Sequence, residues 1–204
     1  MNFKTLYKIL ALLLFLFIAE IGATQIEIMP TLGYLTMINV TEPSGGSPLF
    51  IDEGILYDEF SPSLSLLVRT HGFSLGANIA YSHSSDLFGD FQMTDIESRS
   101  LGLVTIYNYE MSDSGKWLFP MKLSASYRWM TLEHNGLKIT GTAYEVAFKM
   151  GLERALSKRA SFAFLIGRGF VWDELSNDDF MVHPDLEFDC WRFEFYSRIF
   201  MFKF

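Results

Sequence analysis

Apolar and polar residues alternate along most of this chain, and the alternation falls into eight separate segments. In residues 59–69, for example, Phe60, Leu64 and Leu66 are apolar at even positions, and Glu59 and Ser63 are polar at odd ones. A period of two is that of a β-strand, whose side chains point alternately to opposite faces of a sheet. The segments span residues 25–40, 59–69, 73–82, 98–109, 117–129, 141–153, 161–172 and 191–204. The pattern predicts eight strands.

The composition of the polar face indicates which side of these strands meets water. It consists mainly of Ser, Gly, Ala, Thr and Asn, whereas a solvated outer surface would be rich in Lys and Glu. Small side chains suit the narrow interior of an eight-stranded barrel. We therefore predict an all-β fold, a closed antiparallel eight-stranded up-and-down transmembrane β-barrel. A soluble ligand-binding barrel with its apolar face inside has the same period and is the alternative.

Aromatic residues near the segment ends favour the membrane barrel. Outer-membrane barrels carry girdles of Tyr and Trp where their apolar band meets water. The candidates for such girdles are Tyr57, Tyr81, Tyr107, Tyr109, Trp117, Trp129 and Trp172.

The connections between the segments alternate in length. Residues 70–72, 111–116 and 156–159 form short connections, and residues 41–57, 83–97, 130–138 and 173–185 form longer, mostly acidic ones. This alternation is typical of short periplasmic turns and longer extracellular loops. We expect both chain ends of the barrel on the periplasmic side.

The last stretch, Tyr196–Phe204, resembles the C-terminal strand of bacterial outer-membrane barrels, which ends in Phe and is read by the barrel-assembly machinery. The aromatic positions that carry the resemblance are Tyr196, Phe200, Phe202 and Phe204, expected on one face. Just before them the apolar residues are at odd positions, namely Trp191, Phe193 and Phe195. A β-bulge near Phe195 and Tyr196 would reconcile the two phases.

The N-terminal segment has the features of a secretory signal peptide. Lys4 and Lys8 precede an apolar run, Ile9–Ile18, which is too short for a membrane-spanning helix of roughly 20 residues. Small residues follow at Gly22 and Ala23, so we expect cleavage after residue 23 and a barrel domain of residues 24–204.

Charge narrows the range of partners. Removal of residues 1–23 leaves 14 basic and 23 acidic residues, because Lys4, Lys8 and Glu20 are lost from the 16 and 24 of the full chain. A net charge of −9 argues against nucleic acid as a partner. The single cysteine, Cys190, is interpreted as a small apolar strand residue.

Charged residues of both signs occur on the predicted inner face. Buried charges persist when they are paired, so we expect a salt-bridge network that fills the interior. A narrow channel for small or hydrophobic solutes is the alternative. The expected interior charges are Glu27, Glu59, Arg69, Arg99, Lys122, Arg128, Glu145, Lys149 and Glu153.

The long connections are acidic, and Asp173–Asp185 is the densest cluster. Its spacing lacks the regular oxygen ligands and central Gly of a calcium-binding EF-hand loop, so we expect a solvated rim and no metal site or cofactor. Apolar residues in the same loops, such as Phe88 and Phe180, allow contact with a surface partner.

One constellation suggests catalysis. His83, Ser85 and Glu97 resemble the His-x-Ser and downstream Glu of the outer-membrane lipid A deacylases, small barrels whose active site faces the membrane. The resemblance implies Ser85 as nucleophile, His83 as base and Glu97 as its orienting carboxylate. Asp86 stands where that family usually has Asn, and the hairpin lies mid-chain. This esterase is an alternative function, and the principal expectation is that the protein is not an enzyme.

As a whole, the chain resembles the small barrels similar to outer membrane proteins A and X. That resemblance implies a monomer in the outer membrane of a Gram-negative bacterium, in contact with outer-membrane lipid and lipopolysaccharide. It also implies a structural role, surface contact or limited solute passage.

Overall fold

The computed structural model describes residues 25–41, 58–70, 72–84, 94–112, 116–134, 137–157, 159–176 and 185–203. The apolar–polar alternation in these residues forms eight long strands. They are β1 (Gln25–Thr41), β2 (Asp58–Thr70), β3 (Phe73–Ser84), β4 (Thr94–Glu110), β5 (Trp117–His134), β6 (Leu137–Ala155), β7 (Ala160–Ser176) and β8 (Asp185–Lys203).

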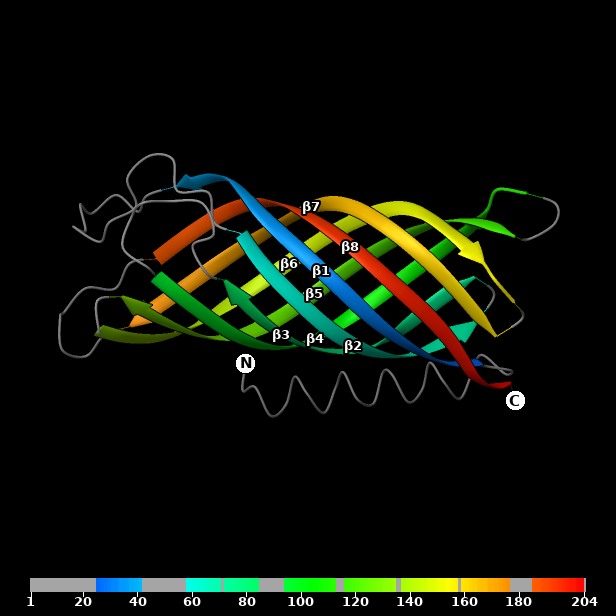
Figure 1. The fold of residues 1–204 in the computed structure, drawn as a ribbon, viewed down its shortest axis with the longest axis horizontal. Helices are drawn as coiled ribbons and strands as arrows, with labels where there is room; N and C mark the ends of the chain where they lie inside the picture. Colours follow the sequence, from blue (N-terminus) through cyan, green and yellow to red (C-terminus); the bar gives the residue numbers. More distant parts are fainter. Residues whose placement is uncertain are drawn as a thin grey trace, which may run out of the picture.

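Each strand pairs in antiparallel fashion with the next one in the sequence, and β1 pairs with β8 to close the barrel (Figure 1). Closure leaves no strand edge with unpaired backbone groups, which the interior of a lipid bilayer requires. The predicted fold class, a closed up-and-down barrel of eight antiparallel strands, is confirmed.

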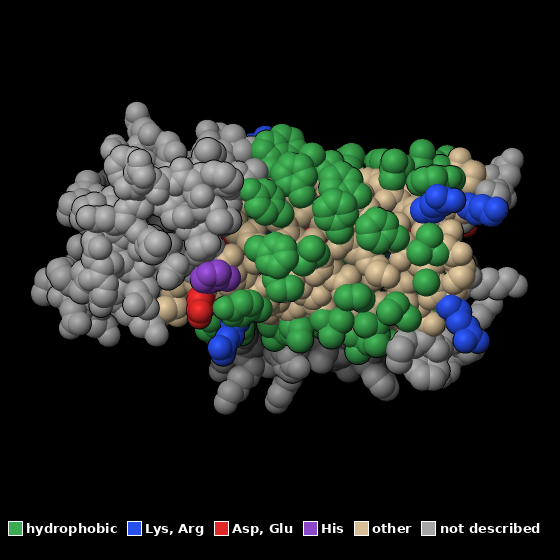
Figure 2. Space-filling view, in the orientation of Figure 1, with side chains coloured by type: hydrophobic (Ala, Val, Ile, Leu, Met, Phe, Trp, Pro, Cys, Tyr) green, Lys and Arg blue, Asp and Glu red, His purple; other side chains and the backbone are tan. Residues whose placement is uncertain are grey.

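Side chains alternate between an apolar outside and a packed inside. On β2, Leu66 is 58% exposed, while its neighbour Leu67 is completely buried. Large apolar side chains cover the middle of the outer surface in Figure 2, with basic side chains near the ends of the barrel. This much exposed apolar surface suits lipid as the surrounding solvent.

No helix in the described part of the chain has the length and apolar character to cross a membrane.

The connection between β2 and β3 shows how the short turns form. Gly72 has a φ of +86°, a conformation that suits glycine because it has no Cβ. Its carbonyl oxygen accepts hydrogen bonds from Asn108 N at 2.7 Å and from Asn108 Nδ2 at 3.1 Å. The Asn108 side chain thereby ties this turn to β4.

The register of β8 differs from the expectation. Trp191, Phe195 and Ile199 are exposed, whereas Tyr196 and Arg198 are buried, so one alternation continues from residue 190 to residue 199. The expected bulge near Phe195 and Tyr196 is therefore wrong.

The pairing of β1 with β8 shifts elsewhere. One shift lies between Ile26, which pairs with Phe202, and Glu27, which pairs with Phe200. The other lies between Met37 and Asn39. Tyr196 accordingly points inward, and its expected place on an outward aromatic row is wrong. The side chains of Phe202 and Phe204 lie outside the described residues.

Two apolar clusters pack inside the barrel at different heights. One lies in the half nearer the short turns and consists of Met29, Leu67, Val104, Ile106, Ala163, Leu165 and Tyr196. The other lies in the half nearer the long connections and consists of Leu35, Met130, Ala143, Val171 and Cys190. Charged side chains fill much of the remaining interior.

Candidate functional site

The interior is built from a half with small side chains and a half with long ones. β2, β3 and β4 point mainly Ser, Gly, Ala and Asn inward, as in Ser65, Gly76 and Ser100. β5, β6 and β8 point long charged side chains inward, including Lys122, Arg128, Lys149, Arg192 and Glu194. The small residues leave room for the charged side chains to extend across the lumen.

Glycines on β7 allow side chains of its two neighbouring strands, β6 and β8, to contact each other. Gly167 pairs with Lys149 on β6 and with Arg192 on β8. A Cβ at Gly167 would lie 1.9 Å from the carbonyl oxygen of Phe148 and 2.8 Å from Lys149 Cγ. Without that Cβ, charged side chains from β6 and β8 reach each other across β7.

Arg128 is the centre of the group nearer the long connections. Its Nη2 lies 2.5 Å from Glu59 Oε2, and its Nη1 lies 3.4 Å from Glu145 Oε2. Nη2 also donates hydrogen bonds to Ser98 Oγ at 2.7 Å and to Ser82 Oγ at 3.1 Å. This buried guanidinium thus links β5 to β2, β3, β4 and β6.

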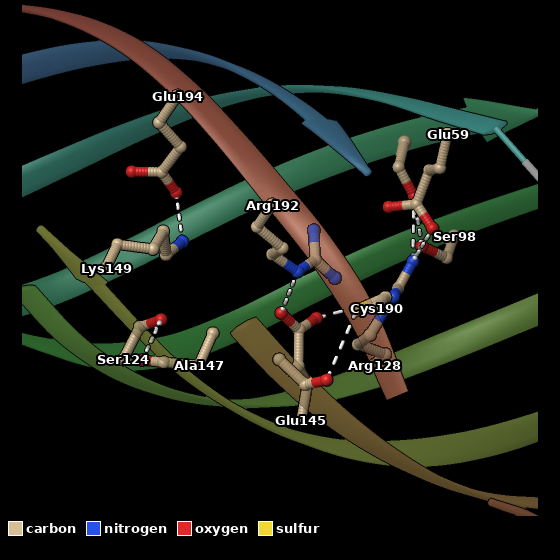
Figure 3. A network of polar contacts seen from close by, with 12 residues as sticks. Glu59, Ser98, Ser124, Arg128, Glu145, Ala147, Lys149, Cys190, Arg192 and Glu194 are labelled. Carbon is tan, nitrogen blue, oxygen red and sulfur yellow. Dashed lines mark hydrogen bonds and ion pairs between the residues drawn. The ribbon is translucent and has the colours of Figure 1, made fainter. Parts of the chain in front are cut away.

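The middle group joins β5, β6 and β8. Lys122 and Lys149 face each other in the register of β5 and β6, an arrangement in which like charges repel. Glu194 compensates for it, accepting a hydrogen bond from Lys122 Nζ at 2.7 Å and another from Lys149 Nζ (Figure 3). Arg192 Nε lies 2.6 Å from Glu145 Oε1.

A third group lies near the short turns around Arg198. Its Nη2 is 3.0 Å from Glu153 Oε2, and its Nε is 3.5 Å from Glu27 Oε2. The Tyr196 hydroxyl donates to Glu153 Oε2 at 2.7 Å, and Arg69 Nη1 lies 3.4 Å from Glu27 Oε1. All but Arg69 are buried.

A cavity of about 50 Å³ remains between the two halves of the lumen. Small side chains of β1 to β5 line one side of it, and Glu145, Arg192 and Glu194 line the other. It is a polar space large enough for a few water molecules or one small ion.

Most of the interior charges expected from the sequence lie in these groups, with one exception. Arg99 is exposed on the outer face of β4, next in register to Tyr81 on β3 and Trp129 on β5. Its expected place in the lumen is wrong, because it is at an odd position, like the outward residues Leu101 and Leu103. An Arg at this aromatic level can lay its stem on lipid and hold its charge near the interface.

Sequence reasoning missed the interior residues Arg192, Glu194 and Arg198, and with them the inward Tyr196. The signal was present, since Arg192 and Glu194 alternate with Trp191, Phe193 and Phe195. Arg198 was obscured by the aromatic residues that follow it.

The structure brings two of the three candidate catalytic residues together. His83 and Glu97 are cross-strand partners on β3 and β4, and both side chains are exposed on the outer face. Ser85 lies outside the described residues.

The described residues contain no group of three His, Cys, Asp or Glu side chains that could hold a metal ion. The acidic positions of the long connections fall outside the described side chains.

Comparison with known proteins places the fold. No protein-family model matches the chain, and no curated protein does. Among solved structures, Neisserial surface protein A is similar with a TM-score of 0.57 and 13% identity, over 88% of this chain and 99% of that one. This likeness shows the fold of a small outer-membrane barrel.

Two further solved structures were found with TM-scores below 0.5. OprG from Pseudomonas aeruginosa has a TM-score of 0.49 and 11% identity, over 87% of this chain and 96% of that one. The attachment invasion locus protein Ail of Yersinia pestis has a TM-score of 0.42 and 13% identity, over 87% of this chain and 99% of that one.

Proposed function

We propose that the protein is a non-conducting outer-membrane barrel with a structural and surface-contact role. The observation that carries the proposal is the interior: buried ion pairs at three levels and two apolar clusters occupy the lumen. A channel needs a continuous hydrated path, and an eight-stranded barrel filled by side chains offers little room for one.

A rigid barrel of this kind supports the long connections at one end. Their acidic residues, including Asp52, Asp90 and Asp178, favour partners with a basic surface. We propose that this end faces outward, that outer-membrane lipid and lipopolysaccharide surround the barrel, and that it is a monomer.

Biogenesis is part of the same proposal. The segment of residues 1–23 would direct secretion and be removed, and the strand that ends at Phe204 would be read by the barrel-assembly machinery. Both ends of the barrel domain would then lie in the periplasm.

The closed interior is tested by conductance in planar lipid bilayers. We expect no discrete current steps from the purified, refolded protein. The control is a triple variant, Lys122→Ser, Lys149→Ser and Glu194→Ser. It removes the long side chains of the middle group from the lumen and should admit ions. Regular current steps from the wild-type protein would instead establish the narrow channel.

The surface role is tested by binding to polylysine-coated beads. Barrels reconstituted in neutral lipid should bind the beads in a salt-sensitive way, because the attraction is electrostatic. A variant with Asp178, Asp179 and Asp185 changed to Asn should bind more weakly, and one with outward Arg99 changed to Gln should not. Equal binding by the wild type and the Asn variant would refute the acidic contact surface.

A second candidate function rests on the cross-strand pairing of His83 and Glu97 at the outer surface. With Ser85 nearby in the sequence, these residues could act as a deacylase-like esterase on a lipid of the outer leaflet. Mass spectrometry of lipid A from cells that express the wild type or Ser85→Ala tests it. Loss of one acyl chain with the wild type only would establish the enzyme, and identical lipid A would exclude it.

A further inference from the structure

Arg154 lies on the outer surface of the barrel, where the apolar band ends on the side of the short turns. It is exposed and stands one residue before the end of β6, and its register partners Trp117 on β5 and Phe162 on β7 are exposed as well. Its guanidinium carbon lies 5.5 Å from the centroid of the Trp117 ring. A guanidinium over an aromatic face is attracted by the ring and keeps the N–H donors at its edge available. The contact with Trp117 thus holds a group of donors at the level of the aromatic girdle.

Lys116 provides a second cation at the same place. It is exposed and directly precedes Trp117, and its backbone carbonyl oxygen accepts a hydrogen bond from Ala155 N at 2.9 Å. This bond joins the end of β6 to the start of β5, so Lys116 and Arg154 lie on the ends of neighbouring strands. Figure 2 shows basic side chains where the apolar surface ends on the side of the short turns.

The two cations differ from others at this end of the barrel in their partners. Arg69 Nη1 lies 3.4 Å from Glu27 Oε1, which neutralises its charge. In the described part of the chain, neither Arg154 nor Lys116 takes part in a salt bridge, although Glu110 on β4 is an exposed carboxylate nearby in the sheet. Because Arg154 stands on a lipid-facing surface, the membrane can supply the missing negative charge in the form of a lipid headgroup.

We propose that Arg154 and Lys116 bind the phosphate of an anionic glycerophospholipid, of the phosphatidylglycerol type, in the leaflet at the short turns. A guanidinium can hold a phosphate through two parallel hydrogen bonds, and an ammonium adds a point charge. A zwitterionic headgroup brings its own ammonium group, which the two cations repel, so they favour a headgroup with a net negative charge. The bound phosphate would fix the depth of this end of the barrel in the membrane. The proposal goes beyond the surface role of the long connections and depends only on an outer surface that faces lipid.

Native mass spectrometry of the folded barrel tests the choice of lipid. Phosphatidylglycerol and phosphatidylethanolamine with identical acyl chains are added in equal amounts to the protein in detergent. The wild type should retain phosphatidylglycerol in preference, because only that headgroup carries a net negative charge. Equal retention of the two lipids would overturn the proposal.

Matched variants locate the site. Arg154→Gln and Lys116→Gln should each lower the preference for phosphatidylglycerol about fivefold, the effect of one basic residue next to an anionic lipid surface. Arg154→Lys, which keeps the charge but loses the planar fork, should lie between the wild type and Arg154→Gln. Arg99→Gln removes an exposed Arg of the outer face near the long connections and should keep the wild-type preference.

An equal loss in Arg99→Gln and Arg154→Gln would show a general attraction of lipid to any outward Arg and would contradict the site. If Arg154→Gln does not fold, Lys116→Gln in the turn and the comparison of lipids with the wild type decide.

Vesicles that contain phosphatidylglycerol in only one leaflet test the position of the site. A Glu-specific protease added outside, which cuts the acidic long connections, shows which leaflet they face. A ligand that binds only the folded state stabilises it. Phosphatidylglycerol in the leaflet at the short turns should therefore raise the urea concentration at which the wild type unfolds, and raise it less in Arg154→Gln. A gain only from the opposite leaflet, or the same gain in Arg154→Gln, would overturn the proposal.

Discussion

At the residue scale, three of the described interior carboxylates, Glu27, Glu145 and Glu194, each pair with two cations. Glu194 accepts from Lys122 and Lys149, and Glu145 faces Arg128 and Arg192. Removing one partner of a buried pair is expensive because the charge left behind stays out of water. Here one lost carboxylate would leave two cations facing each other.

Glu194→Gln is therefore expected to destabilise the barrel strongly. Breaking a buried ion pair costs about 3–5 kcal/mol, and the opposed lysines add their repulsion. Urea unfolding in lipid vesicles, followed by tryptophan fluorescence, measures the change. The matched control is Glu97→Gln on the exposed outer face of β4, which should stay within about 0.5 kcal/mol of the wild type. Equal stability of the two variants would show that the Glu194 pairs contribute little.

Residue parity explains which interior charges the sequence could predict. Glu59 and Arg128 sit on clearly alternating segments, so their inward positions follow from their neighbours. Its charge suggests an inward position for Arg99, but Arg99 is at an odd position, like the outward residues Leu101 and Leu103. Pairing partners from distant strands, such as Arg128 with Glu59, depend on the stagger of the closed barrel and cannot be read from one segment.

At the element scale, β8 shows the limit of pattern reading. Its terminal aromatic residues suggested a change of phase near Phe195, but the buried pairs of Tyr196 and Arg198 hold the same alternation as far as Ile199. The pairing shift lies further on, opposite Ile26 and Glu27.

Spin labels distinguish the observed register of β8 from one with a bulge near Phe195. In a Cys190→Ser background, a nitroxide at Phe195→Cys should be relaxed by oxygen dissolved in the lipid, because that position faces outward. A nitroxide at Tyr196→Cys should be shielded from oxygen. Strong oxygen access at both positions would indicate a bulge near Phe195 and contradict the observed register of β8.

Gly167 on β7 is expected to tolerate no side chain. A Cβ would lie 1.9 Å from the carbonyl oxygen of Phe148, so Gly167→Ala must push β6 and β7 apart. Its free energy of unfolding should fall by about 1–3 kcal/mol, the usual cost of overpacking. A Cβ at Gly33 would lie 3.1 Å from its nearest atom, the carbonyl oxygen of Ser61, so Gly33→Ala should have a smaller effect. The same loss in both variants would argue against the close approach at Gly167.

At the scale of the whole molecule, strand number, closure and the lipid-facing side could be predicted from the sequence. Eight alternating segments, small residues on one face and connections that alternate in length all require the same architecture. The interior cavity could not be predicted, because it arises from side chains of opposite walls that meet only in the closed barrel.

The most direct test of the account is heat-modifiability of the protein in isolated outer membranes. A folded barrel resists detergent until it is heated, so boiled and unboiled samples should migrate differently on a gel. We expect this shift, together with fractionation in the outer membrane. A protein that appears in the soluble periplasm, with one mobility before and after boiling, would mean that the apolar face does not meet lipid and would contradict the account.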